Sequence, residues 1–224
     1  MPAWTPVPPR YTETRVALHT VAEHVLAAAR YRTDGHIGLR PVRGGIGTPT
    51  FDGRRLEVVG GDIVQYTGVD VLREPITTLR SAGTLVGVEP GAPAEVYTPA
   101  TPLDLDAGLE VDPTAADALA EWFALVSDAL GRFAATHASE SPTEAQLWPE
   151  HFDLALVLSQ VTYGGSPGDS GHPEPYLYVG PFTPRQGPFW NESFGASRAG
   201  ADVAGVDDAV AFFEEGHRRA AENR

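Results

Sequence analysis

The chain has 224 residues, 42% of them hydrophobic, and carries a formal net charge of −14 at pH 7. This length suffices to bury a sizeable core, so we expect one domain over residues 1–224, while the negative charge and the missing basic stripe argue against a nucleic-acid partner. All 16 basic residues are Arg and there is no Cys, which excludes Schiff-base lysines, disulfides and thiolate metal sites.

The sequence also points to a location in the cell. No segment reaches the roughly 20 apolar residues of a membrane-spanning helix, and the N-terminus lacks the basic and apolar regions of a signal peptide. We therefore expect a soluble, cytoplasmic protein with no membrane partner. The acidic excess lies late in the chain, because residues 1–90 hold 10 Arg and 9 acids whereas residues 91–224 hold 6 Arg and 21 acids. This asymmetry is typical of an acidic solvated surface.

The first third of the chain predicts a helix followed by strands. Residues 12–31 space their apolar side chains as an amphipathic helix does, and Gly35 ends this pattern. The alternation over residues 36–42 predicts a strand. Two β-rich runs within residues 55–66 are joined by a Gly-Gly pair, which predicts a hairpin.

The remaining helices are indicated by their ends and by their apolar faces. Residues 77–87 fit either a helix or a strand, and we favour a short helix. Residues 104–108 faintly resemble a calcium loop but lack its full set of acids, so we interpret them as a turn. Asp112 and Pro113 have the residue types of an N-cap and a first helical position. A last helix is predicted over residues 207–221.

The most unusual segment begins at residue 147 with a turn that leads into a buried strand. If this segment is extended, His151 and Asp153 lie on the same face of the strand. A carboxylate beside an imidazole fixes the ring tautomer and raises its basicity, so such a pair can serve acid–base chemistry or bind a metal. The alternative interpretation is a His and an Asp at a strand end that hydrogen-bond to nearby backbone.

The segment that follows is rich in glycine and aromatic residues. We expect a loop over residues 161–169, because this stretch is too rich in Gly for regular structure, and the predicted pocket includes residues 163–174 as a loop. After it, Glu174, Tyr176 and Tyr178 alternate onto one face of a strand, as a pocket wall or as half-exposed sheet residues. The run 188–191 is aromatic and polar and is expected to act as a lid.

The first helix carries two histidines around a glutamate. His19 and His24 are five residues apart, about 140° around an α-helix, so they are not expected to bind one ion together. His19 and Glu23 share a flank of the helix, where they form an ordinary i,i+4 pair or contribute to a ligand site.

The run Trp148-x-x-x-Phe152-Asp153-Leu154-Ala155 resembles the core motif of a bacterial family of uncharacterised proteins, domain of unknown function family 5996. Further likenesses are Leu18-His19, the Asp112-Pro113-x-Ala-Ala helix start and Phe212-Phe213 near the C-terminus. Pro149-Glu150-His151 departs from the small residues expected in that family, so the chain is identified as a divergent relative. The resemblance implies a shared α+β fold and implies no activity.

These patterns predict an α+β fold in which a mainly antiparallel sheet packs against about three helices. We expect a small-molecule-binding protein or enzyme with its pocket in residues 147–191, or alternatively a non-catalytic interaction or assembly protein that uses Trp190 and the tyrosines. A third hypothesis, a metal site made of His151, Asp153, His172 and Glu174, matches no known ligand spacing, so no metal ligand is assigned. The sequence specifies neither a cofactor nor an oligomeric state. The predicted catalytic residues are His151, Asp153 and Tyr178, and the predicted ligand-binding residues are Trp148, Tyr163, Glu174, Tyr176, Trp190, Asn191, His19 and Glu23.

Overall fold

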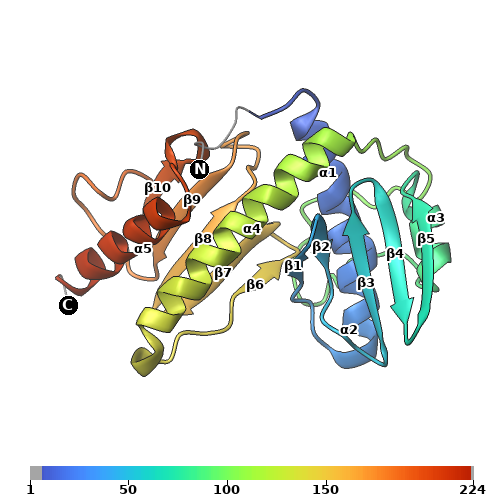
Figure 1. Ribbon diagram of the computed structural model, residues 1–224, viewed down its shortest axis with the longest axis horizontal. Helices are drawn as coiled ribbons and strands as arrows, with labels where there is room; N and C mark the ends of the chain where they lie inside the picture. The colour runs from blue at the N-terminus through green and yellow to red at the C-terminus, as the bar shows by residue number, and fades with distance from the viewer. Residues whose placement is uncertain (1–6, 223–224) are drawn as a thin grey trace. The chain divides into compact units, whose positions relative to one another are not determined.

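The computed structural model describes residues 7–222 (Figure 1). In this part of the chain, two antiparallel sheets and their helices form an α+β fold, which confirms the predicted fold class. The residues group into two compact units. We call residues 7–121 with 147–152 the N-terminal unit, and residues 122–146 with 153–222 the C-terminal unit. The expectation of one domain over the whole chain stays a prediction.

The N-terminal unit contains a five-stranded antiparallel sheet in the order β1-β2-β3-β4-β5. The predicted hairpin is confirmed, since Val59 pairs with Asp62 and Gly60 between them has a left-handed φ of 60°, which glycine adopts without steric cost. The strand predicted over residues 36–42 is shorter, and two further strands were not predicted. The five strands are β1 (Arg40–Val42), β2 (Gly45–Gly47), β3 (Arg54–Val59), β4 (Asp62–Thr67) and β5 (Asp70–Pro75).

The first helix is continuous but not α-helical throughout. It consists of α1 (Tyr11–Val21), a π-helical segment (Ala22–Ala27) and α2 (Ala28–Asp34), and Gly35 ends it with a φ of 76°, as predicted. We had expected one apolar face, but the helix is buried on nearly every side over residues 17–29. Such burial explains how polar residues of this helix come to lie in the interior.

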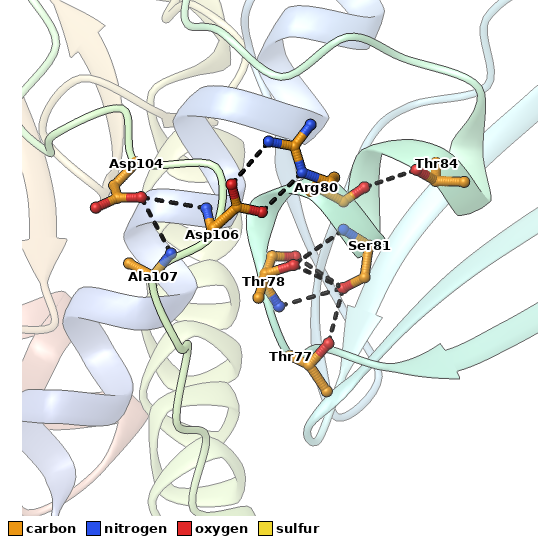
Figure 2. A network of polar contacts seen from close by, with 8 residues as sticks. All are labelled: Thr77, Thr78, Arg80, Ser81, Thr84, Asp104, Asp106 and Ala107. Carbon is orange, nitrogen blue, oxygen red and sulfur yellow. Dashed lines mark hydrogen bonds and ion pairs between the residues drawn. The ribbon is translucent and has the colours of Figure 1, made fainter.

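The short helix favoured over residues 77–87 is confirmed as α3 (Leu79–Val86) (Figure 2). Thr78 and Ser81 form a capping box at its start, which satisfies backbone N–H groups that a helix leaves free. Arg80 forms a bidentate ion pair with Asp106 at 2.7 and 2.8 Å, and the Asp104 carboxylate accepts the amide of Asp106 at 3.1 Å. The stretch that faintly resembles a calcium loop is therefore a bend whose acids bind protein groups.

The remaining helices begin close to where the sequence placed them. Helix α4 (Pro113–Thr136) starts with the predicted cap, because the Asp112 carboxylate accepts the amide of Ala115 at 3.0 Å. Helix α5 (Val206–Ala221) lies near the C-terminus. No helix within residues 7–222 is both long and apolar enough to cross a membrane.

The second antiparallel sheet has the order β10-β9-β8-β7-β6; strands β7 to β10 belong to the C-terminal unit, whereas residues 147–148 of β6 are grouped with the N-terminal unit. Helix α5 and the part of α4 from residue 122 onward cover one face of it: a Cβ on Gly165 would meet Val126 at 2.5 Å, and one on Gly216 would meet Val179 at 2.7 Å (Figure 1). The sheet consists of β6 (Gln146–Trp148), β7 (Asp153–Leu158), β8 (Val161–Ser166), β9 (Tyr176–Pro181) and β10 (Ala196–Ala199), and the C-terminal unit also has the 3-10 turns Ala138–Glu140 and Gly200–Asp202.

The expectation of a loop over residues 161–169 was wrong for residues 161–166, which form strand β8. Strand β8 pairs with both β7 and β9, so the Gly164-Gly165 pair lies inside a sheet. Glycines weaken an isolated strand but are used where another group approaches the backbone closely. On one side of β8 that group is the α4 helix, and on the other side it is the ring of Tyr178.

Candidate functional site

Several predicted site residues meet on the face of the second sheet that is turned away from α4 and α5. The Tyr178 hydroxyl donates a short hydrogen bond to Asp153, and the Tyr176 hydroxyl donates to Asp169 at 2.6 Å. Gly164 makes room for this arrangement, because a Cβ there would lie 2.7 Å from the Tyr178 hydroxyl oxygen. The structure therefore brings two of the three predicted catalytic residues, Asp153 and Tyr178, into contact.

The electrostatics of this face keep the tyrosine protons in place. Burial, followed by the nearby Asp153 charge, raises the pKa of Tyr178, and burial with the Asp169 hydrogen bond raises the pKa of Tyr176. Burial alone would raise the pKa of Asp169, but hydrogen bonds from Tyr176 and from two backbone amides outweigh it and lower that pKa. Each hydroxyl thus serves as a donor to a carboxylate, which is a stable arrangement and a poor proton source.

Other predicted residues lie apart from this face. Tyr163 points to the opposite side of the sheet and contacts His217 through its hydroxyl, at 3.2 Å. Glu174 is exposed and precedes β9. The amide of Asn191 bonds the backbone of Ser197 on β10 in both directions, so it fixes a turn.

The run expected to form a lid contacts α5 instead of Tyr178. The Phe189 ring packs on Phe212 of α5 at 5.6 Å, and the half-buried Trp190 ring meets Phe189 edge-on at 4.9 Å. The assembly surface expected around Trp190 stays a prediction. His172 contacts Glu192 at 3.2 Å, and its ring packs against that of Tyr176 with centres 4.9 Å apart and planes tilted by 44°, so the residues proposed for a metal site are divided among several pairs.

The expected strand pair of His151 and Asp153 does not form. Strand β7 begins only at Asp153, and Phe152 before it has a left-handed backbone with a φ of 53°. A bulky residue in this region is unusual and indicates a conformation that the surroundings impose. The Phe152 amide donates to the Trp148 carbonyl at 2.8 Å, which closes a turn and leaves His151 exposed.

This turn orients His19, the predicted site residue on α1. The Nε2–H of His19 donates to the Pro149 carbonyl at 2.7 Å, and the imidazole stacks on Phe152 with ring centres 4.9 Å apart and planes 8° apart. Since Nε2 carries the proton of the neutral ring, Nδ1 has the lone pair. Within residues 7–222, Nδ1 makes no hydrogen bond. Burial is the main reason that the pKa of His19 is lowered, which favours the neutral imidazole.

Glu23 and His24 lie in the π-helical segment and attach a loop to the helix. The Glu23 carboxylate is fully buried and accepts the amides of Ala100 and Thr101, at 2.9 and 2.8 Å, and the Thr101 hydroxyl, at 2.5 Å. His24 accepts the amide of Ala92 on Nδ1 and donates from Nε2 to the Thr101 carbonyl. Both nitrogens of His24 are therefore used structurally, whereas His19 keeps a free lone pair.

The loop held in this way carries Tyr97, a residue that the sequence analysis passed over. The hydroxyl of Tyr97 and Oε2 of Glu150 are buried and have no hydrogen-bond partner among residues 7–222. Burial, followed by the charges of Glu23 and Glu150, raises the pKa of Tyr97, so both carboxylates lie close enough to act on the Tyr97 hydroxyl. We call His19, Glu23, Tyr97 and Glu150 the helix site, after α1 and the π-helical segment. All four belong to the N-terminal unit.

The helix site offers a defined chemistry. It combines a neutral imidazole lone pair, a carboxylate oxygen and a phenol, all partly or fully buried. Polar atoms without partners in a folded interior are uncommon, and they are most often explained by a bound water, ion or ligand. A sequence signal did exist, since Tyr97 is an aromatic residue in the Pro-, Gly- and Asp-rich stretch 90–112, but nothing local connects it with α1.

Comparisons with known proteins identify no family for this chain. No family model, curated protein or solved structure matches this chain. The resemblance to domain of unknown function family 5996 therefore stays a prediction.

Proposed function

We propose that this protein binds a small molecule rich in hydrogen-bond donors, an amine or a polyol, at the helix site. The observation that supports this most directly is the pair of buried, unpartnered oxygens on Tyr97 and Glu150. A buried polar group without a partner lowers the free energy of unfolding by about 1–3 kcal/mol, so two of them destabilise the folded chain substantially. A ligand that supplies the missing partners removes this cost.

The ligand class follows from what the site presents. The lone pair of His19 Nδ1 and the Glu150 carboxylate are acceptors, and the Tyr97 hydroxyl can accept as well as donate. The matching ligand carries hydroxyl or ammonium groups. The formal charge of −14 also attracts cations to the protein as a whole.

The helix site includes part of the segment that the sequence singled out. Of residues 147–191, the stretch 149–152 contributes Glu150 and the two groups that orient His19. A neutral imidazole with a free lone pair is also what a general base requires, so deprotonation of a bound hydroxyl is the enzymatic form of this proposal. We retain a cytoplasmic location as part of the proposal, on the composition of the chain.

The proposal is tested by thermal shift against a panel of amines and polyols. A ligand at a hundredfold its Kd stabilises by about 2.7 kcal/mol, which raises the Tm of a chain of this size by about 5–10 °C. For a hit, Tyr97→Phe and Glu150→Gln should each weaken binding about tenfold, because each removes one hydrogen bond. Tyr31→Phe is the matched control: Tyr31 is a half-buried tyrosine on α2, outside the helix site.

Two results would count against this function. One is a panel in which no amine or polyol shifts the Tm. The other is a hit whose affinity is the same in Tyr97→Phe, Glu150→Gln and Tyr31→Phe, because the ligand would then bind elsewhere.

A further inference from the structure

A second group of polar residues lies in the C-terminal unit, where it contacts one predicted site residue, Tyr163. His137 follows α4, Glu140 ends the 3-10 turn after it, and His217 lies on α5. Each of the three offers one ligand atom, and these atoms all lie within 4.8 Å of one another. Two imidazoles and a carboxylate are the ligand types of many zinc and iron sites.

The distances agree with a shared ion. Oε1 of Glu140 lies 2.8 Å from Nδ1 of His137 and 3.4 Å from Nε2 of His217. With metal–ligand distances of about 2.1 Å, two ligand atoms of a tetrahedral site are about 3.4 Å apart. One contact already has this length, and the other must lengthen by about 0.6 Å. The Glu140 side chain, 39% exposed, is free to make this adjustment.

The two imidazoles are also hydrogen-bonded to further residues, as metal-binding histidines are. Nε2 of His137 lies 3.0 Å from Oε2 of Glu214, and Nδ1 of His217 lies 3.2 Å from the Tyr163 hydroxyl. Each imidazole thus has one nitrogen toward Glu140 and the other bound to a second residue. A metal-binding histidine almost always donates its other N–H to a carboxylate or another oxygen, which fixes the tautomer.

The packing around the cluster fixes the imidazoles as well. The rings of His137 and His217 are 4.3 Å apart, and both pack against Phe133, which is fully buried on α4. Oε2 of Glu140 contacts the Ser159 hydroxyl at 3.4 Å, so this carboxylate presents Oε1 to the two rings. The side chains of His137 and His217 are 13% and 19% exposed, which leaves an ion a path from solvent.

We propose that His137, Glu140 and His217 bind one divalent first-row transition-metal ion of the zinc class. Three protein ligands leave a fourth coordination position for water or a substrate atom, which is the arrangement of catalytic zinc sites and not of closed structural ones. This site is separate from the helix site and does not depend on the function proposed for it.

A different interpretation of the same contacts is a hydrogen-bonded network without an ion. In that case a protonated His137 donates to Glu140 and Glu214 at once. The two interpretations differ in one respect that can be measured, since the network has no affinity for a metal.

The experiment uses the full chain purified without a histidine tag and freed of metal by a chelator. Zn²⁺ is titrated by calorimetry, and bound zinc is counted after dialysis. Co²⁺ provides a second readout, because four-coordinate Co²⁺ has strong visible absorption. We expect one ion per chain for both metals.

The variants locate the ion. Glu140→Gln and His217→Gln each remove a ligand and should weaken Zn²⁺ binding by more than a hundredfold, whereas Glu144→Gln, an exposed glutamate four residues from Glu140, should bind as the parent does. Tyr163→Phe and Glu214→Gln keep all three ligands and should weaken binding by about tenfold to a hundredfold. Glu140 is itself exposed, so its replacement should leave the far-ultraviolet circular dichroism unchanged.

The proposal is overturned if the parent protein binds no Zn²⁺, since the cluster is then a hydrogen-bonded network only. It is equally overturned if folded Glu140→Gln and His217→Gln proteins bind Zn²⁺ as tightly as Glu144→Gln, because the ion then has other ligands.

Discussion

Replacement of Glu23 should destabilise the protein more than replacement of an exposed glutamate does. The carboxylate is fully buried and accepts three hydrogen bonds from the loop at residues 100–101. In Glu23→Ala the amide and hydroxyl of Thr101 lose their acceptor in a buried position, at about 1–3 kcal/mol each, while the Ala100 amide is partly exposed and turns to water. Together with the cavity that the shorter side chain leaves, we expect Glu23→Ala to lower the free energy of unfolding by about 3–6 kcal/mol, a large part of its typical value.

Glu23→Gln separates hydrogen bonding from volume. Its amide oxygen keeps both Thr101 donors, and its NH₂ group faces the Ala100 amide, so we expect a loss of only about 1–2 kcal/mol. The free energies of unfolding are measured in urea by circular dichroism, and exchange of the Thr101 amide proton reports the loop directly. Glu121→Ala, at an exposed position of α4, should lie within about 0.5 kcal/mol of the parent.

A free energy of unfolding for Glu23→Ala within about 0.5 kcal/mol of the parent's, as expected for Glu121→Ala, would contradict a structural role of the Glu23 carboxylate. Such a result would mean that water reaches Thr101 as easily as Glu23 does.

Three further predictions concern single positions. The lowered pKa of His19 means that the unfolded chain binds a proton before the folded one, so stability should fall as pH drops below the ordinary value of 6.5; urea titrations should show a weaker fall in His19→Gln. Gly164→Ala places a Cβ 2.7 Å from the Leu154 carbonyl oxygen and should cost about 1–3 kcal/mol, whereas Gly180→Ala has no atom closer than 3.6 Å and should cost less; equal losses of unfolding free energy would contradict this. Thr78→Ala removes the α3 cap and should lower the free energy of unfolding by about 1 kcal/mol, a loss absent if water replaces the cap.

Much of the fold could be predicted because its signals are local. The Gly-Gly hairpin, the end of the first helix at Gly35 and the cap at Asp112 each depend on a few neighbouring residues, and all three are confirmed. Strand β8 was missed because its glycines are explained only by what packs against them, the ring of Tyr178 and the side chain of Val126.

The candidate sites depend on contacts between distant segments, which one sequence does not show. Glu23 meets Thr101 across 78 positions, and His137 meets Glu214 across 77. His19 and Glu23 were found from their spacing on a helix, but the groups that contact them are distant in sequence: the turn at residues 149–152 for His19 and the loop at residues 100–101 for Glu23. Asp153 and Tyr178 were also placed together, although Phe152 turns the chain and separates His151 from them.

The π-helical segment Ala22–Ala27 absorbs one residue without changing the rotational phase of the helix around it. A π turn holds about one more residue than an α turn, so the six residues of this segment cover roughly the rotation that five residues cover in an α-helix. Loss of one residue here would therefore restore an ordinary α-helix and leave α1 and α2 facing nearly the same directions as before. Loss of one residue within α1 would instead rotate everything after it by about 100°. The chain can thus change its length at the π-helical segment with less disturbance of the contacts on either side than anywhere else in this helix.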